Sequence, residues 1–470
     1  MNQKINELLS TVLMEKNISF LLGAGASTPF FSSLGNLENV LTNSSINKSG
    51  KQLIKALFYD TSIANNIYLM DYLQDCLLDD GEDEKIMHSI LLQYKRFIHN
   101  ILEYMKVRNS RVSPKRTNII TTNYDLFIEA AIDDILEDNP RVHFNDGTNG
   151  YTKKILQTDN FNKTLLYSGI FDNYSNEMPT INLIKCHGSV NWRTHYSRDN
   201  KKRIQIDSSI NTVHELNSLI DALFDGIEAF ITKEEDLKNY LTSTEDLIEL
   251  INEKSSEDIK DDINLIGDHF SDELSEIENK LAEMQIVYPT KKKFESTLVN
   301  EYYFSLLRLL SYELEKEQTT LIVFGFSFYD EHITEIVQRS LNNPNLLVII
   351  FCFADKNKNE IISNFNFTPN TIPNNIKFIL PSEFIIKTID IETYKQETED
   401  EGLAANNIIV DDERVTIYSN EVSFIKKEDG SKMATLNFSS LNQLLEADIT
   451  NTFNEKHFSV LPDEGDDFLE

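Results

Sequence analysis

The chain has 470 residues, and its 44 basic and 76 acidic side chains give a net charge of −32. This length predicts two or three domains, and a hydrophobic content of 40% is enough for a packed core. A surface this acidic repels phosphate backbones, so we expect neither a direct nucleic-acid partner nor binding to an anionic membrane.

Cysteine spacing and apolar runs indicate the compartment. Cys76, Cys186 and Cys352 lie far apart, which argues against a disulfide framework and against a zinc module of paired cysteines. Residues 1–20 have no apolar signal region, and the longest apolar run, 346–353, is far shorter than the ~20 residues that cross a bilayer. We therefore predict a cytoplasmic protein without a metal ion.

Short apolar runs predict the central fold. Each run is apolar throughout, which is typical of parallel strands covered on both faces. Helical patterns follow two of the runs, at 126–136 and 332–341. This alternation predicts an α/β fold with a doubly wound parallel sheet. The predicted strands are 18–22, 118–122, 182–186, 321–324, 346–353 and 376–380.

Two helical insertions are expected outside this sheet, at about 50–108 and 201–285. The second is strongly acidic and contains an apolar seam with heptad-like spacing. Two interpretations remain open: a helical hairpin that packs on itself, or a surface for an oligomer or a partner. The seam consists of Ile259, Ile263, Ile266, Phe270, Leu274, Ile277 and Leu281.

The sequence changes character near residue 385. We expect a main domain at 1–385 and a small C-terminal module at 386–470. Strands are predicted at 384–391, 408–418 and 422–425, before an acidic tail at 461–470.

The first motif is a run of small residues directly after the strand at 18–22. It reads Gly23, Ala24, Gly25, Ala26 and Ser27 in a chain that contains only 15 glycines. Small residues let a ligand approach the backbone, and N–H groups there bind a diphosphate. The third glycine of the dinucleotide fingerprint is missing, and a tight turn without a ligand is the alternative.

The second motif, at 121–125, follows the next strand and contains Thr122, Asn123 and Asp125. An asparagine both donates and accepts hydrogen bonds, so it can hold a ribose hydroxyl and a water molecule. The alternative is that Asn123 or Asp125 caps the following helix.

The third motif, at 185–189, places His187 and a glycine after the strand at 182–186. A histidine at a strand end can serve as a general base near neutral pH, although a structural histidine is the alternative. The fourth motif is Gly325 and Ser327, with Asp330 before the next helix. It can hold a ribose, or it is a simple turn in which Ser327 or Asp330 is the N-cap.

In this order, the four motifs resemble those of the sirtuin family, over about residues 18–380. Sirtuins bind NAD in a Rossmann-like domain. They carry a Gly-Ala-Gly-x-Ser loop, a Thr-Gln-Asn-x-Asp segment, a His-Gly with the catalytic histidine, and a Gly-Thr-Ser that holds the adenosine ribose. The resemblance implies a Rossmann-like sheet and NAD as the substrate.

The departures from that pattern point away from protein deacylation. Residues 28–35 replace the Ile-Pro-Asp-Phe-Arg of the deacylases, Thr122 replaces a glutamine, and the four zinc cysteines are missing. The chain is more similar to the sirtuin-like, NAD-hydrolysing domains of bacterial anti-phage systems, also at 287–290 and 325–333. Two alternatives are an NAD or ADP-ribose sensor that does not hydrolyse its ligand, and a residual deacylase.

The resemblance also implies roles for the site residues. The loop Gly23 to Ser27 would hold the diphosphate, and Asn123 and Asp125 would lie around the nicotinamide and its ribose, with Thr122 as a further binding residue. His187, as the general base, and Asn123 would be the catalytic residues. Gly325 and Ser327 would hold the adenosine ribose.

Regulation by assembly is a further expectation. An NAD hydrolase that was always active would deplete its host. We therefore expect gating through a homo-oligomer, or through a partner such as the HerA-type ATPase of related systems.

Overall fold

The structure is a computed structural model, in which a part of the chain is described. The described residues are 2–31, 40–41, 43–74, 76, 81–108, 114–168, 175–209, 211–234, 237, 239–254, 257–288, 301–368, 371–394, 407–410, 414–427 and 430–446.

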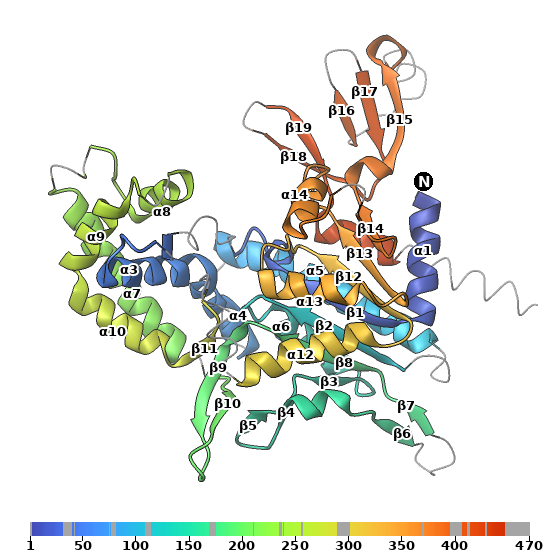
Figure 1. Ribbon diagram of the computed structural model, residues 1–470, viewed down its shortest axis with the longest axis horizontal. Helices are drawn as coiled ribbons and strands as arrows, with labels where there is room; N and C mark the ends of the chain where they lie inside the picture. Colours follow the sequence, from blue (N-terminus) through green and yellow to red (C-terminus); the bar gives the residue numbers. More distant parts are fainter. Residues whose placement is uncertain are drawn as a thin grey trace, which may run out of the picture.

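Within these ranges, a seven-stranded sheet forms the centre of the molecule (Figure 1), in the order β14-β13-β12-β1-β2-β8-β3. Every neighbouring pair is parallel. The strands are β1 (Asn17–Leu22), β2 (Arg116–Thr121), β3 (His143–Asn145), β8 (Thr180–Lys185), β12 (Thr319–Phe324), β13 (Leu346–Phe351) and β14 (Ile376–Ile379). All six predicted strands lie in this sheet, which confirms the parallel α/β prediction and is consistent with a Rossmann-like fold.

The order of the strands reverses beside β1. From β1 the chain builds β2, β3 and β8 on one side, and only later returns to build β12, β13 and β14 on the other. In open α/β sheets, ligands bind at such a switch point, outside the carboxyl ends of the strands. Here the switch point lies between β1 and β12.

Helices cover both faces of the sheet because successive side chains of each strand point in opposite directions. Phe20 and Leu22 belong to one apolar core, and Leu21 belongs to the other. The first core contains α1 (Asn2–Glu15), α5 (Glu82–Val107), α6 (Phe127–Asp138) and a last helix at 438–446. The second contains α12 (Glu301–Glu315), α13 (Glu331–Ser340) and α14 (Asn357–Asn364).

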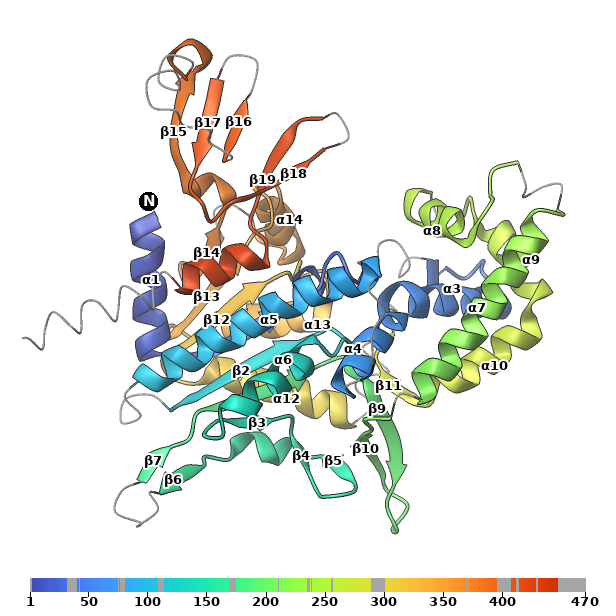
Figure 2. The same cartoon turned by 180° about the vertical axis from the view of Figure 1, so that it is seen from behind.

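Parts of the two predicted helical insertions join into one lateral lobe (Figure 2), whereas α5, the second half of the first insertion, packs on the main sheet. From the first come α3 (Lys48–Tyr59), a π-helical turn (Asp60–Ala64) and α4 (Asn66–Leu73). From the second come α7 (Asn211–Ile231), α8 (Thr244–Glu253), α9 (Lys260–His269) and α10 (Ser271–Leu281), and α3 packs against α9 and α10.

The seam lies in this lobe and is interrupted at Phe270, between α9 and α10. Its other members are at most 2% exposed and pack within the chain's own core, mainly against α3 and α7. Of the two interpretations of the seam, the structure supports packing within the chain and contradicts an assembly surface, because the helices that bury it come from the same chain.

A second sheet, in the order β11-β9-β10-β5-β4, was not predicted. Its longest strand, β9 (Gly188–Tyr196), begins directly after His187 and turns back into β10 (Lys202–Ile206). The helical prediction at 201–206 was therefore wrong. The other strands are β4 (Thr148–Asn149), β5 (Lys154–Leu156) and β11 (Met284–Ile286), and a separate pair joins β6 (Leu166–Ser168) to β7 (Ser175–Glu177).

The C-terminal segment is a small β module whose last helix returns to the main sheet. The module contains β15 (Ile385–Asp390), β16 (Ile408–Val410), β17 (Arg414–Tyr418), β18 (Ser423–Lys426) and β19 (Lys432–Thr435). The strand predicted at 408–418 is in fact two antiparallel strands. In the last helix, Phe438 stacks on Phe324 of β12 and contacts Tyr94 and Phe97 of α5.

The predicted acidic tail, 461–470, lies outside the described residues. No helix in the described ranges is both long enough and apolar enough to cross a membrane.

Candidate functional site

The four predicted motifs follow four adjacent strands. In the sheet order β12-β1-β2-β8, the strands end before Gly325, Gly23, Thr122 and Cys186, respectively. Because the strands are parallel, their carboxyl ends share one edge of the sheet. The structure therefore brings together motifs that are up to 300 residues apart (325 − 25).

The loop after β1 rests on the loop after β12, backbone against backbone. Gly23 N–H donates to the Phe324 carbonyl (3.1 Å), and Gly25 N–H donates to the Gly325 carbonyl (3.0 Å). Gly325 has a φ of +66°, and a Cβ there would lie 2.6 Å from the nitrogen of Ala26. Glycine is therefore required for close packing across the switch point, whether or not a ligand is present.

The same hydrogen bonds change the expected role of the loop N–H groups. Ala26 N–H and Ser27 N–H donate to Gly23 and Ala24 carbonyls, so four N–H groups of the loop are already used within the chain. Ala24 and Gly25 are exposed. A ligand would meet the small surface of these two residues rather than a row of free donors.

A buried hydrogen bond between Ser27 and Asp125 joins this loop to the segment that follows β2. Ser27 is fully buried, and its Oγ donates to Asp125 Oδ2 (2.7 Å). Tyr94 OH lies 2.9 Å from the same Oγ, and Asn123 Nδ2 donates to it (3.2 Å). Burial raises the pKa of Asp125, while Lys185 and the Ser27 hydroxyl oppose this rise. These contacts fix the shape of the loop.

Asn123 lies between the Ser27–Asp125 hydrogen bond and the surface of the site. Its Nδ2 also donates to the Gly23 carbonyl (3.1 Å), and its own N–H is held by Thr121 Oγ1 (3.0 Å). In the described part of the chain, the side-chain hydrogen bonds of Asn123 use only Nδ2. Its carbonyl oxygen is thus left for a ligand or water. Thr122, beside it, is half-buried.

His187 faces Asp330, which was predicted only as a helix cap. The distance between His187 Nε2 and Asp330 Oδ2 is 3.1 Å, and the side chains are 10% and 7% exposed. Asp330 Oδ1 accepts from His332 N–H (3.1 Å) and Ile333 N–H (3.3 Å) at the start of α13. A carboxylate only accepts, so neutral His187 carries its proton on Nε2 and leaves Nδ1 as the basic nitrogen.

Lys185 links the end of β8 to α6. It is 2% exposed, and its Nζ pairs with Glu129 Oε1 (2.6 Å) and donates to the Asp125 carbonyl (2.5 Å) and Ser189 Oγ (2.9 Å). Sequence reasoning missed Glu129 and Tyr94. The only signal for Glu129 is its position in the first turn of the helix that follows Asp125.

Two groups near the site, the Ser327 side chain and the Cys186 thiol, offer less to a ligand or a reaction than their positions suggest. Ser327 is exposed, and its described polar contact is a hydrogen bond from Asn364 Nδ2 to its carbonyl (2.9 Å). Burial, reinforced by Asp330, raises the pKa of the Cys186 thiol to about 12, so this cysteine is not a nucleophile at neutral pH.

Within the described ranges, no three His, Cys, Asp or Glu side chains gather as metal ligands would. In sequence comparisons, the chain matches no family model and no curated protein. The functional argument therefore depends on the geometry of the site and on the motifs that compose it.

Proposed function

We propose that the chain is an NAD⁺ hydrolase, which cleaves the N-glycosidic bond of NAD⁺ and releases nicotinamide and ADP-ribose. The observation that supports this proposal most directly is the convergence of four motifs, in sirtuin-like order, on adjacent strand ends at the switch point. NAD⁺ is the substrate here, so no resident cofactor is required.

The proposed chemistry assigns distinct tasks to the residues of the site. Cleavage passes through an oxocarbenium-like state, which well-placed polar groups stabilise. Asn123 would direct its free carbonyl oxygen toward the nicotinamide ribose or the attacking water. His187 would accept a proton at Nδ1 from a ribose hydroxyl or from water, while Asp330 keeps Nε2 protonated and fixes the ring.

The remaining assignments concern binding. Ala24 and Gly25 would contact the diphosphate, with Ser27 and Asp125 holding the loop from behind. Gly325 and Ser327 would hold the adenosine ribose. Thr122 would contribute at the nicotinamide end.

The test is the fate of NAD⁺ with the purified full chain under activating conditions. His187→Ala and Asn123→Ala should each lower the rate of NAD⁺ loss by about 10²–10⁴-fold, which is the usual value of a positioned general base. His99→Ala, which removes an exposed histidine on α5, should leave the rate unchanged. If both site variants consumed NAD⁺ at the parental rate, the site assignment would be wrong.

Product analysis separates hydrolysis from binding alone. Released nicotinamide and ADP-ribose support the hydrolase. A ligand that binds and is recovered intact indicates a sensor module instead. An assay on an acetylated peptide tests deacylation.

The biological role that we propose follows from the sirtuin-like resemblance. Depletion of NAD⁺ would make the chain an effector of anti-phage defence, gated by self-assembly or by a HerA-type ATPase. Sizing of the purified chain, with and without such an ATPase, tests the two modes of gating.

A further inference from the structure

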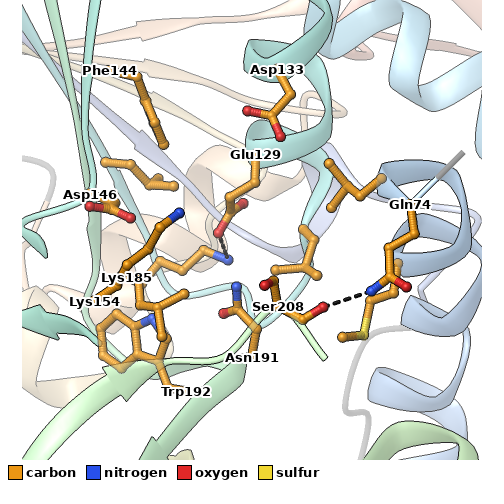
Figure 3. A pocket seen from close by; sticks show the side chains of 15 residues that line it. Gln74, Glu129, Asp133, Phe144, Asp146, Lys154, Lys185, Asn191, Trp192 and Ser208 are labelled. Carbon is orange, nitrogen blue, oxygen red and sulfur yellow. Dashed lines mark hydrogen bonds and ion pairs between the residues drawn. The ribbon is translucent and has the colours of Figure 1, made fainter. Parts of the chain in front are cut away.

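A separate cavity lies beside the proposed NAD⁺ site. Its volume is about 210 Å³, and it lies between helices α4 and α6 and strands β8, β9 and β10 (Figure 3). None of the residues assigned to NAD⁺ lines it. Lys185 stands between the two sites, because it lines the cavity while its Nζ donates to the Asp125 carbonyl.

Two of the residues that line this cavity each carry a buried acceptor atom without a partner in the described part of the chain. These atoms are Oε2 of Glu129, whose other oxygen pairs with Lys185, and Oδ1 of Asn191, a residue that is 9% exposed. Figure 3 shows Glu129 extending from α6 toward Asn191 on β9. A buried acceptor without a partner costs free energy, so this pair favours a ligand that donates hydrogen bonds.

The charge and shape of the lining narrow the class of ligand. Among the described lining residues, Glu129, Asp133 and Asp146 outnumber Lys154 and Lys185, so the balance is negative. The rings of Trp192 and Phe144 supply flat apolar walls. A cavity of about 150 Å³ accommodates benzene, so this one accommodates a single ring with a substituent.

We propose that the Glu129–Asn191 cavity is a second ligand site, which binds a small planar molecule with N–H donors and a neutral or positive charge. Amidines, guanidines and amino-substituted heterocycles belong to this class. The donors would engage Glu129 Oε2 and the Asn191 carboxamide, and the ring would lie against Trp192. The site is independent of the proposed NAD⁺ hydrolysis.

The chain carries its own reporter for this site, because Trp192 is its only tryptophan. Benzamidine, 2-aminopyridine and methylguanidine are titrated into the full chain, and Trp192 emission is followed. At least one should give a saturable change. Benzoate, which keeps the ring of benzamidine but carries a carboxylate, should not.

Substitutions at Asn191 identify the acceptor. Asn191→Leu should weaken binding at least about tenfold, by removing one buried hydrogen bond to a charged donor. Asn191→Asp keeps an acceptor and adds negative charge, so it should bind benzamidine at least as tightly as the parent. Asn342→Leu, at the end of α13 and outside the lining, should not change the affinity.

Three results would overturn the proposal. One is the absence of a saturable signal with all three probes up to about 10 mM, which is weak binding for a protein site. Another is equal binding of benzoate and benzamidine. The third is unchanged affinity in both Asn191 variants. Because Asn191→Leu is predicted to weaken binding and Asn191→Asp is not, poor folding of either variant does not reproduce the expected pattern.

Discussion

At the scale of single residues, Asp330 combines two tasks that are usually separate. One carboxylate oxygen caps α13, and the other faces His187. The cap fixes the carboxylate, and the carboxylate fixes the imidazole. The position of the basic nitrogen therefore depends on where a helix begins.

The substitution Asp330→Asn should keep the helix cap but remove the carboxylate that fixes the His187 imidazole. Asparagine is as good an N-cap as aspartate, so the free energy of unfolding should change little. Its amide would offer His187 either a donor or a neutral acceptor, and the tautomer would no longer be fixed. We expect kcat for NAD⁺ loss to fall by about 10²-fold or more, with KM nearly unchanged. Asp330→Ala should in addition lose about 1 kcal/mol of stability with the cap. A parental kcat in Asp330→Asn would exclude the positioning role.

The substitution Gly325→Ala tests the packing across the switch point, and Gly430→Ala is the matched control. Both have positive φ, but a Cβ at Gly430 would meet nothing within 4 Å, whereas one at Gly325 would collide with the loop at Ala26. Gly430→Ala should cost about 1 kcal/mol from backbone strain alone. Gly325→Ala should cost clearly more and also reduce NAD⁺ loss. Urea unfolding gives the two values, and equal costs would contradict the packing argument.

At the scale of elements, the π-helical turn between α3 and α4 contains Asp60, a carboxylate whose charged form is destabilised by its surroundings. Burial raises the pKa of Asp60 to about 6, and Asp221 and Glu245 reinforce this effect. The folded state therefore binds this proton more tightly than the unfolded chain does. The stabilisation is complete below the unfolded pKa of 3.8 and is lost as the pH rises through about 6.

Asp60→Asn should remove this dependence on pH. At pH 7.5 the variant should be more stable than the parent by about 1 kcal/mol, a small value because the side chain is partly exposed. The difference should shrink steadily toward pH 4. Urea unfolding across this range provides the measurement, and Asp225→Asn, on the exposed side of α7, controls for the loss of one negative charge. A difference that grew at low pH would contradict the assignment.

The elements also show how far the sequence alone could lead. Strands buried on both faces are continuously apolar, so six strands of the main sheet could be predicted, but the three-residue β3 could not. In the seam, periodicity shows that a face is buried but not which chain buries it. The strand-end rule located His187 and Asn123. The pairing of His187 with Asp330 and that of Ser27 with Tyr94 depend on contacts between distant segments, which no local pattern reveals.

At the scale of the whole molecule, the C-terminal module and the main domain share a core. Phe438 lies between Phe324 and Tyr94, and Tyr94 in turn contacts Ser27. The last helix thus supports the loop Gly23 to Ser27 from behind, through a single intermediate side chain.

Phe438→Ala should therefore weaken both the fold and the site. Loss of a buried phenylalanine costs about 3–5 kcal/mol, and the loop at Ser27 would lose support through Tyr94. Phe424→Ala, in the half-buried β18 hairpin of the same module, should cost less and leave NAD⁺ loss unchanged. The free energy of unfolding and the rate of NAD⁺ loss are measured for both variants. If Phe438→Ala and Phe424→Ala had similar effects on both quantities, the C-terminal module would fold as one body, separate from the main domain.

The contact between Gly25 and Gly325 has a consequence for the time at which the candidate site is assembled during synthesis. Gly25 is made by the ribosome 300 residues (325 − 25) before Gly325, on whose carbonyl the first loop rests. The last supporting helix, at 438–446, follows more than 100 residues later (438 − 325 = 113). Contacts of such long sequence separation form late. A nascent or prematurely terminated chain therefore has no assembled site, and under the proposed function fragments released by stalled ribosomes would not hydrolyse NAD⁺.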